Sequence, residues 1–204
     1  MPKIVDRDAR RHEIVETYLA LVAREGMEAA TTRRLAQELG VATGALWHYF
    51  ANLDEVLAQA FDLVFERTST RIADHVGDAA GLTALVRMIE QIHPLDKVTN
   101  DEALVVVNFW GRATAHRHQG VREAFAERQW QDEYRAHLDQ AVAAGELRAG
   151  TPTTALANAL LVLALGHQVT YVLETPLAEA DLQWDTIRVL IDPWLTDVGR
   201  ERIG

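Results

Sequence analysis

The segment Thr31–Phe50 reads TTRRLAQELGVATGALWHYF, and its spacing predicts two short helices joined by a tight turn. Thr31 can cap the first helix, because its hydroxyl can accept a hydrogen bond from a free backbone N–H. Gly40 follows the last turn of that helix, where glycine adopts a left-handed conformation without strain. Leu46 and Phe50 lie four residues apart, so both face the core from the second helix. This pattern is typical of a helix-turn-helix.

The opposite face of the second helix carries small and hydrogen-bonding side chains. Gly44 and Ala45 are small enough to let a helix backbone enter a DNA major groove, which is about 12 Å wide. Trp47, His48 and Tyr49 can donate N–H or O–H groups to phosphates or base edges. Exposing such a run is costly without a partner, which favours DNA binding. The alternative is a helical hairpin in which these aromatic side chains only pack.

Residues 10–61 resemble the DNA-binding domain of the tetracycline-repressor family. The shared positions are Ile14, Val15, Gly26, Thr31, Leu35, Ala36, Gly40, Val41, Gly44, Leu46, Trp47, Tyr49, Phe50, Asp54 and Glu55. The resemblance implies a repressor with a three-helix DNA-binding domain, a helical domain for effector binding and dimerisation, and a homodimer on a palindromic double-stranded DNA operator. It also implies phosphate contacts from Thr31, Arg33, Thr43, Trp47 and Tyr49, and groove contacts from Gly44, Ala45 and His48.

Four positions depart from the family pattern. Ala42 stands where the family usually has a serine cap, which costs about 1 kcal/mol of helix stability. Thr43 replaces a frequent lysine, and Trp47 replaces a common tyrosine. Leu53 stands where a lysine commonly contacts a phosphate, and losing one such contact lowers the salt dependence of binding by about one unit of slope. These departures bear on base specificity at the ends of the operator and leave the binding mode intact.

The rest of the chain is predicted to be helical, since apolar residues recur at helical spacing and strand-like alternation is nearly absent. Glycine and proline separate the segments. The expected helices span residues 8–26, 31–39, 43–50, 54–76, 82–92, 101–117, 121–144, 153–173 and 181–198. We therefore predict an all-α fold of about nine helices. The DNA-binding domain is expected in residues 1–53 and the effector-binding and dimerisation domain in residues 54–204.

The charge of the chain is unevenly distributed. The formal net charge is −10, but residues 1–53 carry seven basic and seven acidic side chains, and the remainder carries 13 and 23. A neutral N-terminal part can point basic side chains at phosphates while the acidic remainder is repelled from DNA. Arg33 and Arg34 begin the first helix of the motif, where their charges can face a phosphate.

Composition excludes several other classes of site. The chain has no cysteine, which excludes disulfides, thiolate metal sites and cysteine nucleophiles. The first eleven residues lack the apolar core of a secretion signal. The longest apolar run, residues 155–165, is shorter than the roughly 20 residues that span a membrane. We therefore expect a cytoplasmic protein with no membrane contact.

The last two expected helices are apolar enough to suggest a dimer interface. The family resemblance implies that they pair with their copies as a four-helix bundle. The candidate interface residues are Leu156, Ala159, Leu160, Leu163, Ile187, Leu190, Ile191 and Trp194. The alternative is that both are ordinary core helices of one subunit.

The middle helices supply candidates for an effector site. A mostly apolar pocket with a few polar groups suits a small apolar or aromatic effector. The candidate lining residues are Phe109, Trp110, His116, Trp130, Tyr134, His167 and Tyr171, and Gln168 offers a further polar group. Each aromatic residue could instead belong to the core, and His167 on an apolar helix could be a hydrogen-bonded core histidine.

Two other classes of protein remain as alternatives. A di-iron bundle enzyme needs two Glu-x-x-His pairs on facing helices, whereas this chain has one, Glu90 and His93, with Glu133 and His137 four residues apart. A helical interaction module would leave the Thr31–Phe50 pattern unexplained. No nucleophile triad or phosphate-binding glycine loop stands out, so we expect neither an enzyme nor a bound cofactor or metal.

Overall fold

The computed structural model describes residues 7–115 and 120–203, with side chains given for these except residues 113–115 and 120–127. Every regular element within these ranges is helical, and one isolated antiparallel bridge joins Leu147 to Leu195. The all-α prediction is therefore confirmed.

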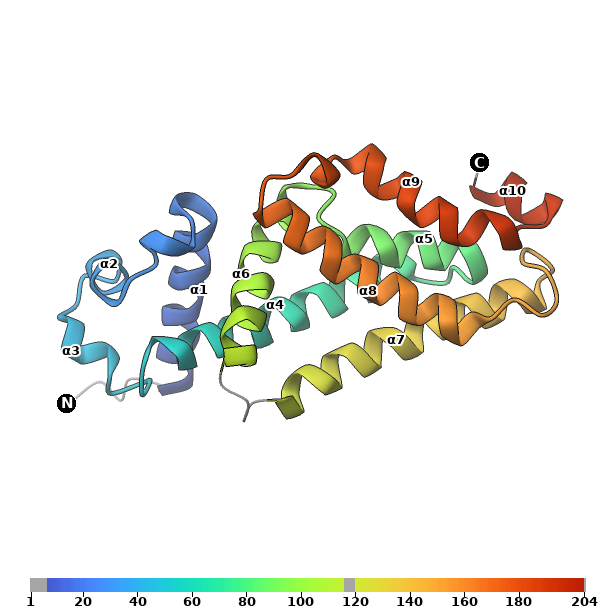
Figure 1. Cartoon of the computed structure of the whole chain (residues 1–204). Helices are drawn as coiled ribbons and strands as arrows, with labels where there is room; N and C mark the ends of the chain where they lie inside the picture. The colour runs from blue at the N-terminus through green and yellow to red at the C-terminus, as the bar shows by residue number, and fades with distance from the viewer. Residues whose placement is uncertain (1–6, 116–119, 204) are drawn as a thin grey trace.

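The N-terminal head consists of four elements at one end of the molecule (Figure 1). They are α1 (Arg7–Glu25), the 3₁₀ turn η1 (Met27–Ala29), α2 (Thr32–Glu38) and α3 (Thr43–Leu46). Helix α1 buries Ile14, Tyr18 and Leu21 at helical spacing, and α2 packs on both α1 and α3. This head presents α3 at the tip, away from the rest of the chain.

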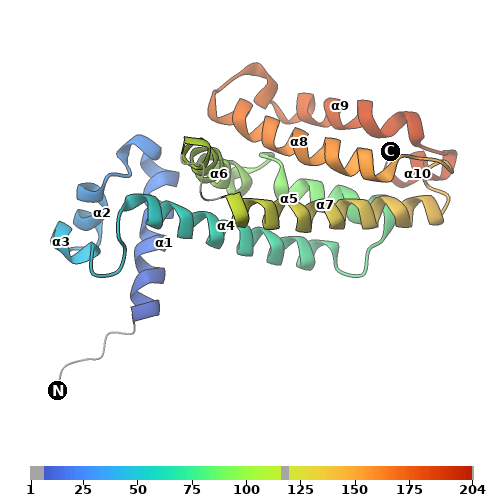
Figure 2. The same ribbon diagram turned by 60° about the horizontal axis from the view of Figure 1, so that its bottom comes forward.

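Helix α4 (Leu53–Val76) runs out of the head into the body of the molecule (Figure 2). The side chain of Asn52 caps its start by accepting from the Glu55 N–H at 2.9 Å, and Gly77 ends it with a φ of +50°. Because α4 is long and amphipathic, its two halves enter different apolar cores.

The body contains the remaining helices. These are α5 (Gly81–Ile92), α6 (Lys97–Ala115), α7 (Gly120–Ala143), α8 (Thr153–Val172), η2 (Pro176–Ala178), α9 (Ala180–Ile191), η3 (Asp192–Trp194) and α10 (Asp197–Ile203). Helices α8 and α9 lie side by side along one face of the body (Figure 2).

Two apolar clusters fill the interior. The head cluster comprises the buried apolar residues of α1 to α3, the first half of α4 from Val56 to Val64, and Val105, Val106 and Phe109 of α6. The body cluster comprises the buried apolar residues of α5, α7, α8 and α9 together with Ile72 and Val76 of α4. The head core thus extends beyond the predicted domain boundary at residue 53, and that division stays a prediction.

Three helix boundaries differ from the predicted ones for local reasons. Helix α6 begins at Lys97, a turn early, because the Asp96 carboxylate accepts from the Thr99 N–H at 2.9 Å and caps it. The predicted last helix breaks into α9, η3 and α10, because Pro193 has no N–H to donate. Helix α3 ends at Leu46, and the residues to Tyr49 continue as turn.

Candidate nucleic-acid interface and ligand pocket

The outer face of α3 is open, and its inner face is anchored in the head cluster. Leu46 and Phe50 are each 2% exposed, whereas Trp47 is 40% exposed and His48 is also exposed. A methyl group added to Gly44 would meet no atom within 4 Å. A large partner can therefore come close to the backbone of α3 on the face formed by these residues.

The turn before α3 has the predicted conformation. Gly40 has a φ of +66°, the left-handed region that favours glycine, and the Val41 N–H donates to the Ala36 carbonyl at 3.0 Å. Ala42 occupies the cap position of α3 without a side-chain hydrogen bond, as the missing serine predicts. Thr31 caps α2, accepting from the Arg34 N–H at 3.3 Å, so its hydroxyl proton stays available to a phosphate.

Arg11 anchors the turn that follows α3 and was not foreseen from the sequence. Its guanidinium donates to the Tyr49 carbonyl and to the Glu55 carboxylate at 2.8 Å, and it lies 4.2 Å from the centre of the Phe50 ring. The Ala51 N–H and then Arg11 hold the pKa of Glu55 below its usual value. Arg11 therefore joins α1 to the turn between α3 and α4 through contacts that span about forty residues of sequence.

The two arginines at the start of α2 have different surroundings. Arg34 pairs with Glu25 at 2.6 Å and with Glu38 at 3.0 Å, so part of its charge is compensated within the head, and its contact with a phosphate stays a prediction. Arg33 is exposed, and no ion pair engages it among the residues with described side chains. All eight residues predicted to contact DNA lie on α2, α3 or their flanking turns, and only Ala45 and Tyr49 are half-buried.

A cavity lies between the head and body clusters. Its walls come from α4, α6, α7 and α8 together with the end of α5, and its interior has room for roughly two water molecules. The lining residues are Phe61, Val64, Phe65, Ile92, Val106, Trp110, Trp130, Leu161, Ala164, Leu165 and Gln168. Phe61, Val64 and Val106 belong to the head cluster, while Ile92 and Ala164 belong to the body cluster.

Three buried polar atoms on lining residues have no hydrogen-bond partner. They are the Nε1 atoms of Trp110 and Trp130 and the Oε1 atom of Gln168. The Gln168 Nε2 atom is satisfied, since it donates to the Ile92 carbonyl at 3.2 Å. Five further buried polar atoms in the described part of the chain, away from the cavity, also have no partner within the protein, so these three do not by themselves mark a ligand.

The other predicted effector contacts lie elsewhere. Phe109 stacks on Phe61 with ring centres 4.1 Å apart, and Tyr134 is fully buried in the body cluster. Tyr171 is half-buried and does not line the cavity, and His116 lies outside the described residues. Phe61 and Phe65 were missed, because on α4 they follow the same spacing as ordinary core positions.

His167 forms a buried pair with His93 rather than lining the cavity. The two Nδ1 atoms are 2.9 Å apart, His93 is fully buried, and His167 is 6% exposed. Burial, and then the neighbouring His167, lower the pKa of His93 to about 3. Burial also lowers the pKa of His167. Among the described residues, no three histidine or carboxylate side chains come together as a metal site would need.

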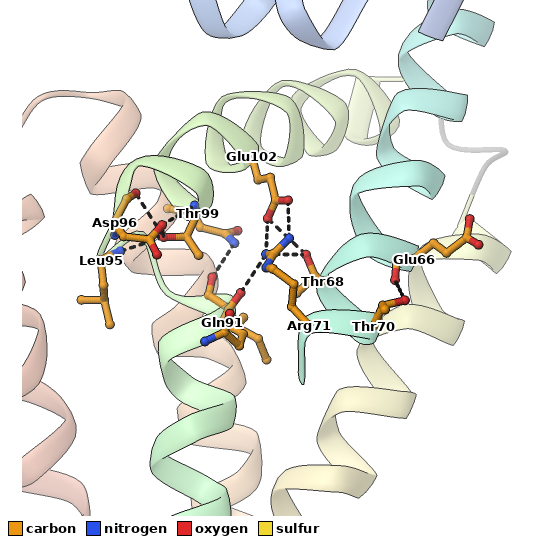
Figure 3. A network of polar contacts seen from close by, with 11 residues as sticks. Glu66, Thr68, Thr70, Arg71, Gln91, Leu95, Asp96, Thr99 and Glu102 are labelled. Carbon is orange, nitrogen blue, oxygen red and sulfur yellow. Dashed lines mark hydrogen bonds and ion pairs between the residues drawn. The ribbon is translucent and has the colours of Figure 1, made fainter. Parts of the chain in front are cut away.

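A bidentate ion pair connects α4, α5 and α6 (Figure 3). The Arg71 Nη1 and Nη2 atoms donate to the two Glu102 oxygens at 2.8 and 2.7 Å. The Thr68 hydroxyl donates to the same carboxylate at 3.2 Å, and Arg71 also donates to the Gln91 carbonyl at 3.4 Å. Because α6 also packs on α1, this network links the body to the head.

The predicted dimer residues divide between core and surface. Leu156, Leu160, Ile187 and Ile191 are buried in the subunit's own body cluster, so they are not available to a second copy. The other four, Ala159, Leu163, Leu190 and Trp194, are half-buried. The most exposed apolar side chains of α8 and α9 are instead Val162 at 67%, Val169 at 42%, Leu182 at 42% and Val189 at 73%.

Helix α8 is also the only helix in the described part of the chain with the length and hydropathy of a membrane span. A core helix of a soluble protein meets the same criteria. Four of its apolar side chains, Leu156, Ala157, Leu160 and Ala164, are buried in this subunit, which accounts for part of its apolar character.

Comparison with known proteins gives two family matches. Residues 14–60 match the family described as bacterial regulatory proteins, tetR family. Residues 81–195 match the family described as BetI-type transcriptional repressor, C-terminal.

Individual relatives agree with these matches. The HTH-type transcriptional regulator PksA of Bacillus subtilis is 36% identical over 117 residues, which cover 57% of this chain and 55% of that protein. The HTH-type transcriptional regulator BetI of Paraburkholderia phymatum is 31% identical over 91 residues, covering 42% of this chain and 46% of that protein. The chain thus spans about half the length of the curated relatives it matches. A crystal structure of a putative regulator from Saccharomonospora viridis in complex with choline has the same fold, with a TM-score of 0.78, 21% identity, and coverage of 91% of this chain and 96% of that one.

Proposed function

The chain belongs to the tetR family of bacterial regulatory proteins, and on that premise we propose that it is a transcriptional repressor that binds a palindromic operator as a homodimer. A small apolar or aromatic effector releases it from the DNA. We assign DNA binding to residues 1–53, and effector binding and dimerisation to residues 54–204. The protein acts in the cytoplasm, where its operator lies, and has no catalytic role.

The open outer face of α3 carries this proposal. Trp47 and His48 are exposed there while Leu46 is buried beneath them, and nothing crowds Gly44. A short helix whose inner face is packed in the core and whose outer face is open to solvent can enter a major groove. Exposed Thr43 and Arg33 lie beside it and can donate to the flanking phosphates.

The short length of α3 and the surface of α8 and α9 support homodimerisation. A helix of four residues reads few base pairs, so a second copy is needed for a specific site. The side-by-side α8 and α9 expose Val162 and Val189 at 67% and 73%. Exposed apolar side chains on two adjacent helices favour a partner surface of the same kind.

Effector release requires that ligand binding changes the spacing of the two heads. The cavity has walls from both clusters, and α4 and α6 each contribute to the head. A ligand that separates these walls tilts α4 relative to the body. Half-sites on DNA repeat at about 34 Å, so a tilt that moves the two α3 helices by a few ångströms weakens binding.

The test is a mobility shift with the DNA upstream of the protein's own gene, comparing Trp47→Ala with the parent protein. Losing one phosphate or base contact at this exposed position should weaken binding about tenfold or more. The control is Arg135→Ala, which removes an exposed positive charge on α7, far from α3. Equal binding by the Trp47→Ala variant would mean that α3 does not contact DNA. Circular dichroism should give the same melting curve for all three proteins, because Trp47 is exposed.

A further inference from the structure

A groove at the junction of the head and the body is a second candidate ligand site. It lies where α1 faces α4 and α6 (Figures 1 and 2). We propose that this groove binds a small organic cation with an apolar chain, such as a primary alkylammonium ion. The groove shares only Val64 with the cavity assigned to the effector, and its role goes beyond the proposed function.

The groove is large enough for a small molecule. Its volume is about 310 Å³, and ligand sites in proteins commonly begin at roughly 300 Å³. Ala20 and Ala23 lie three residues apart on one face of α1 and both line the groove. Because their side chains are single methyl groups, the space between α1 and the two neighbouring helices stays open.

Most of the wall is apolar. Besides the two alanines, it includes Leu19 of α1, Val64 of α4, and Val98 and Val105 of α6. Val98 is exposed, so a ligand chain that covers it removes apolar surface from water. The groove therefore suits a ligand with an aliphatic part.

The charged lining residues favour a positive group on that ligand. They are three carboxylates, Glu16, Asp101 and Glu102, and one guanidinium, Arg67. Arg67 already pairs with Glu16, and Glu102 is held by Arg71 (Figure 3). An anionic ligand would thus meet three carboxylates and a guanidinium that has a partner, whereas a cation is complementary to the wall.

Asp101 is the carboxylate most available to such a cation. Its ion-pair partner is Lys97 at 2.7 Å, whose side chain is 83% exposed and does not line the groove. An exposed pair one helical turn apart contributes little stability. A ligand ammonium can therefore replace Lys97 or share the carboxylate at small cost, while its chain lies on the apolar wall.

Isothermal titration calorimetry of the full chain at pH 7 without DNA tests the ligand class. The probes are n-hexylamine, 1-hexanol and hexanoate, which share a chain length and differ in charge. We expect saturable binding of hexylamine, at least about threefold weaker binding of hexanol, and no saturable binding of hexanoate. Hexanol binding as tightly as hexylamine, saturable hexanoate binding, or no binding of hexylamine at millimolar concentration would each overturn the proposal.

Two variants locate the binding. Asp101→Asn keeps the shape of the side chain and removes its charge, so hexylamine should bind about 3- to 10-fold more weakly while hexanol binding is unchanged. The matched control is Asp132→Asn, because Asp132 also pairs within its own helix, with Arg135 at 3.0 Å, and lies outside the groove. Ala20→Phe fills the groove and should weaken binding of both probes.

Unchanged hexylamine affinity in either groove variant would place the ligand elsewhere and refute the assignment. A changed sedimentation coefficient of Ala20→Phe would also refute it, since the groove would then be a contact between two copies of the chain. Operator binding measured without amine is independent of these results, so a failure here is distinct from a failure of the proposed function.

Discussion

Lowering the pH from 7 to 5 should destabilise the fold through the buried histidine pair. His93 is fully buried with its Nδ1 atom 2.9 Å from that of His167, and its Nε2 atom has no partner. Burial lowers the pKa of His93 to about 3 from an ordinary value of 6.5. In the unfolded chain the pKa of the same imidazole is near 6.5. Between pH 3 and pH 6.5 the unfolded chain therefore binds a proton at His93 that the folded chain does not bind.

The sign and size of the effect follow from proton linkage. The unfolded state binds more protons between pH 6.5 and pH 3. The free energy of unfolding therefore has its full value above pH 6.5 and falls as the pH decreases towards 3. One pH unit is worth about 1.36 kcal/mol, so His93 alone removes about 2 kcal/mol between pH 6.5 and pH 5. The pKa of His167 is also lowered by burial, so this residue acts in the same direction. The pKa of Glu55 is instead held below the ordinary carboxylate value, so its contribution is lost only below pH 5.

Urea denaturation followed by circular dichroism at pH 7, 6 and 5 measures this loss. In His93→Gln the pH dependence should shrink by about 2 kcal/mol, whereas exposed His75→Gln should behave as the parent protein does. If His93→Gln does not fold, His167→Gln should reduce the pH dependence in the same direction, by the part that His167 contributes. The reasoning fails if the parent and both buried-histidine variants lose equal stability between pH 7 and 5, or if NMR titration shows the His93 ring protonated at pH 5.

Three further outcomes are expected. Arg11→Ala should weaken operator binding about tenfold in a mobility shift, since the turn after α3 loses its anchor at the Tyr49 carbonyl; unchanged affinity would show that α3 is held by packing alone. A double-mutant cycle of Arg71→Ala and Glu102→Gln in urea should give a coupling free energy of about 1–2 kcal/mol, because this partly buried pair is bidentate; additive effects would contradict that geometry. Val189→Arg should shift sedimentation from dimer to monomer, because a charge would be buried at the α8–α9 surface, and a stable dimer would move the interface elsewhere.

Local signals made most of the fold predictable. Gly40 and Gly77 end helices in left-handed conformations, which is a property of single residues that a sequence displays directly. The break at Pro193 was equally visible, but the apolar spacing on both sides of it favoured one continuous helix. The early start of α6 depends on a side-chain cap at Asp96, which competes with several equally plausible starts nearby.

The two candidate sites differ in how much the sequence could reveal. The α3 face is built from consecutive residues, so its small and donor side chains can be seen as a pattern. The cavity is built from four helices and the end of a fifth, and Phe61 and Gln168 meet there only through packing between residues about a hundred positions apart. Four of the predicted dimer residues lie in the core for a related reason: α8 is apolar on nearly every side, so its spacing does not distinguish inward Leu160 from outward Val162.

The head cluster includes residues of α4 and α6 as well as of α1 to α3. This affects how a DNA-binding head could be exchanged between regulators of this kind. Recombination just after residue 53 would join a foreign recognition unit to Val56–Val64 of α4 and to Val105, Val106 and Phe109 of α6. These residues pack against the head of this chain. In such a hybrid the core side chains of the foreign head would not match the volumes of the α4 and α6 side chains at the junction. A transplant that also carries the first three turns of α4, with compensating changes on α6, keeps the donor's packing and should preserve both folding and signal transmission.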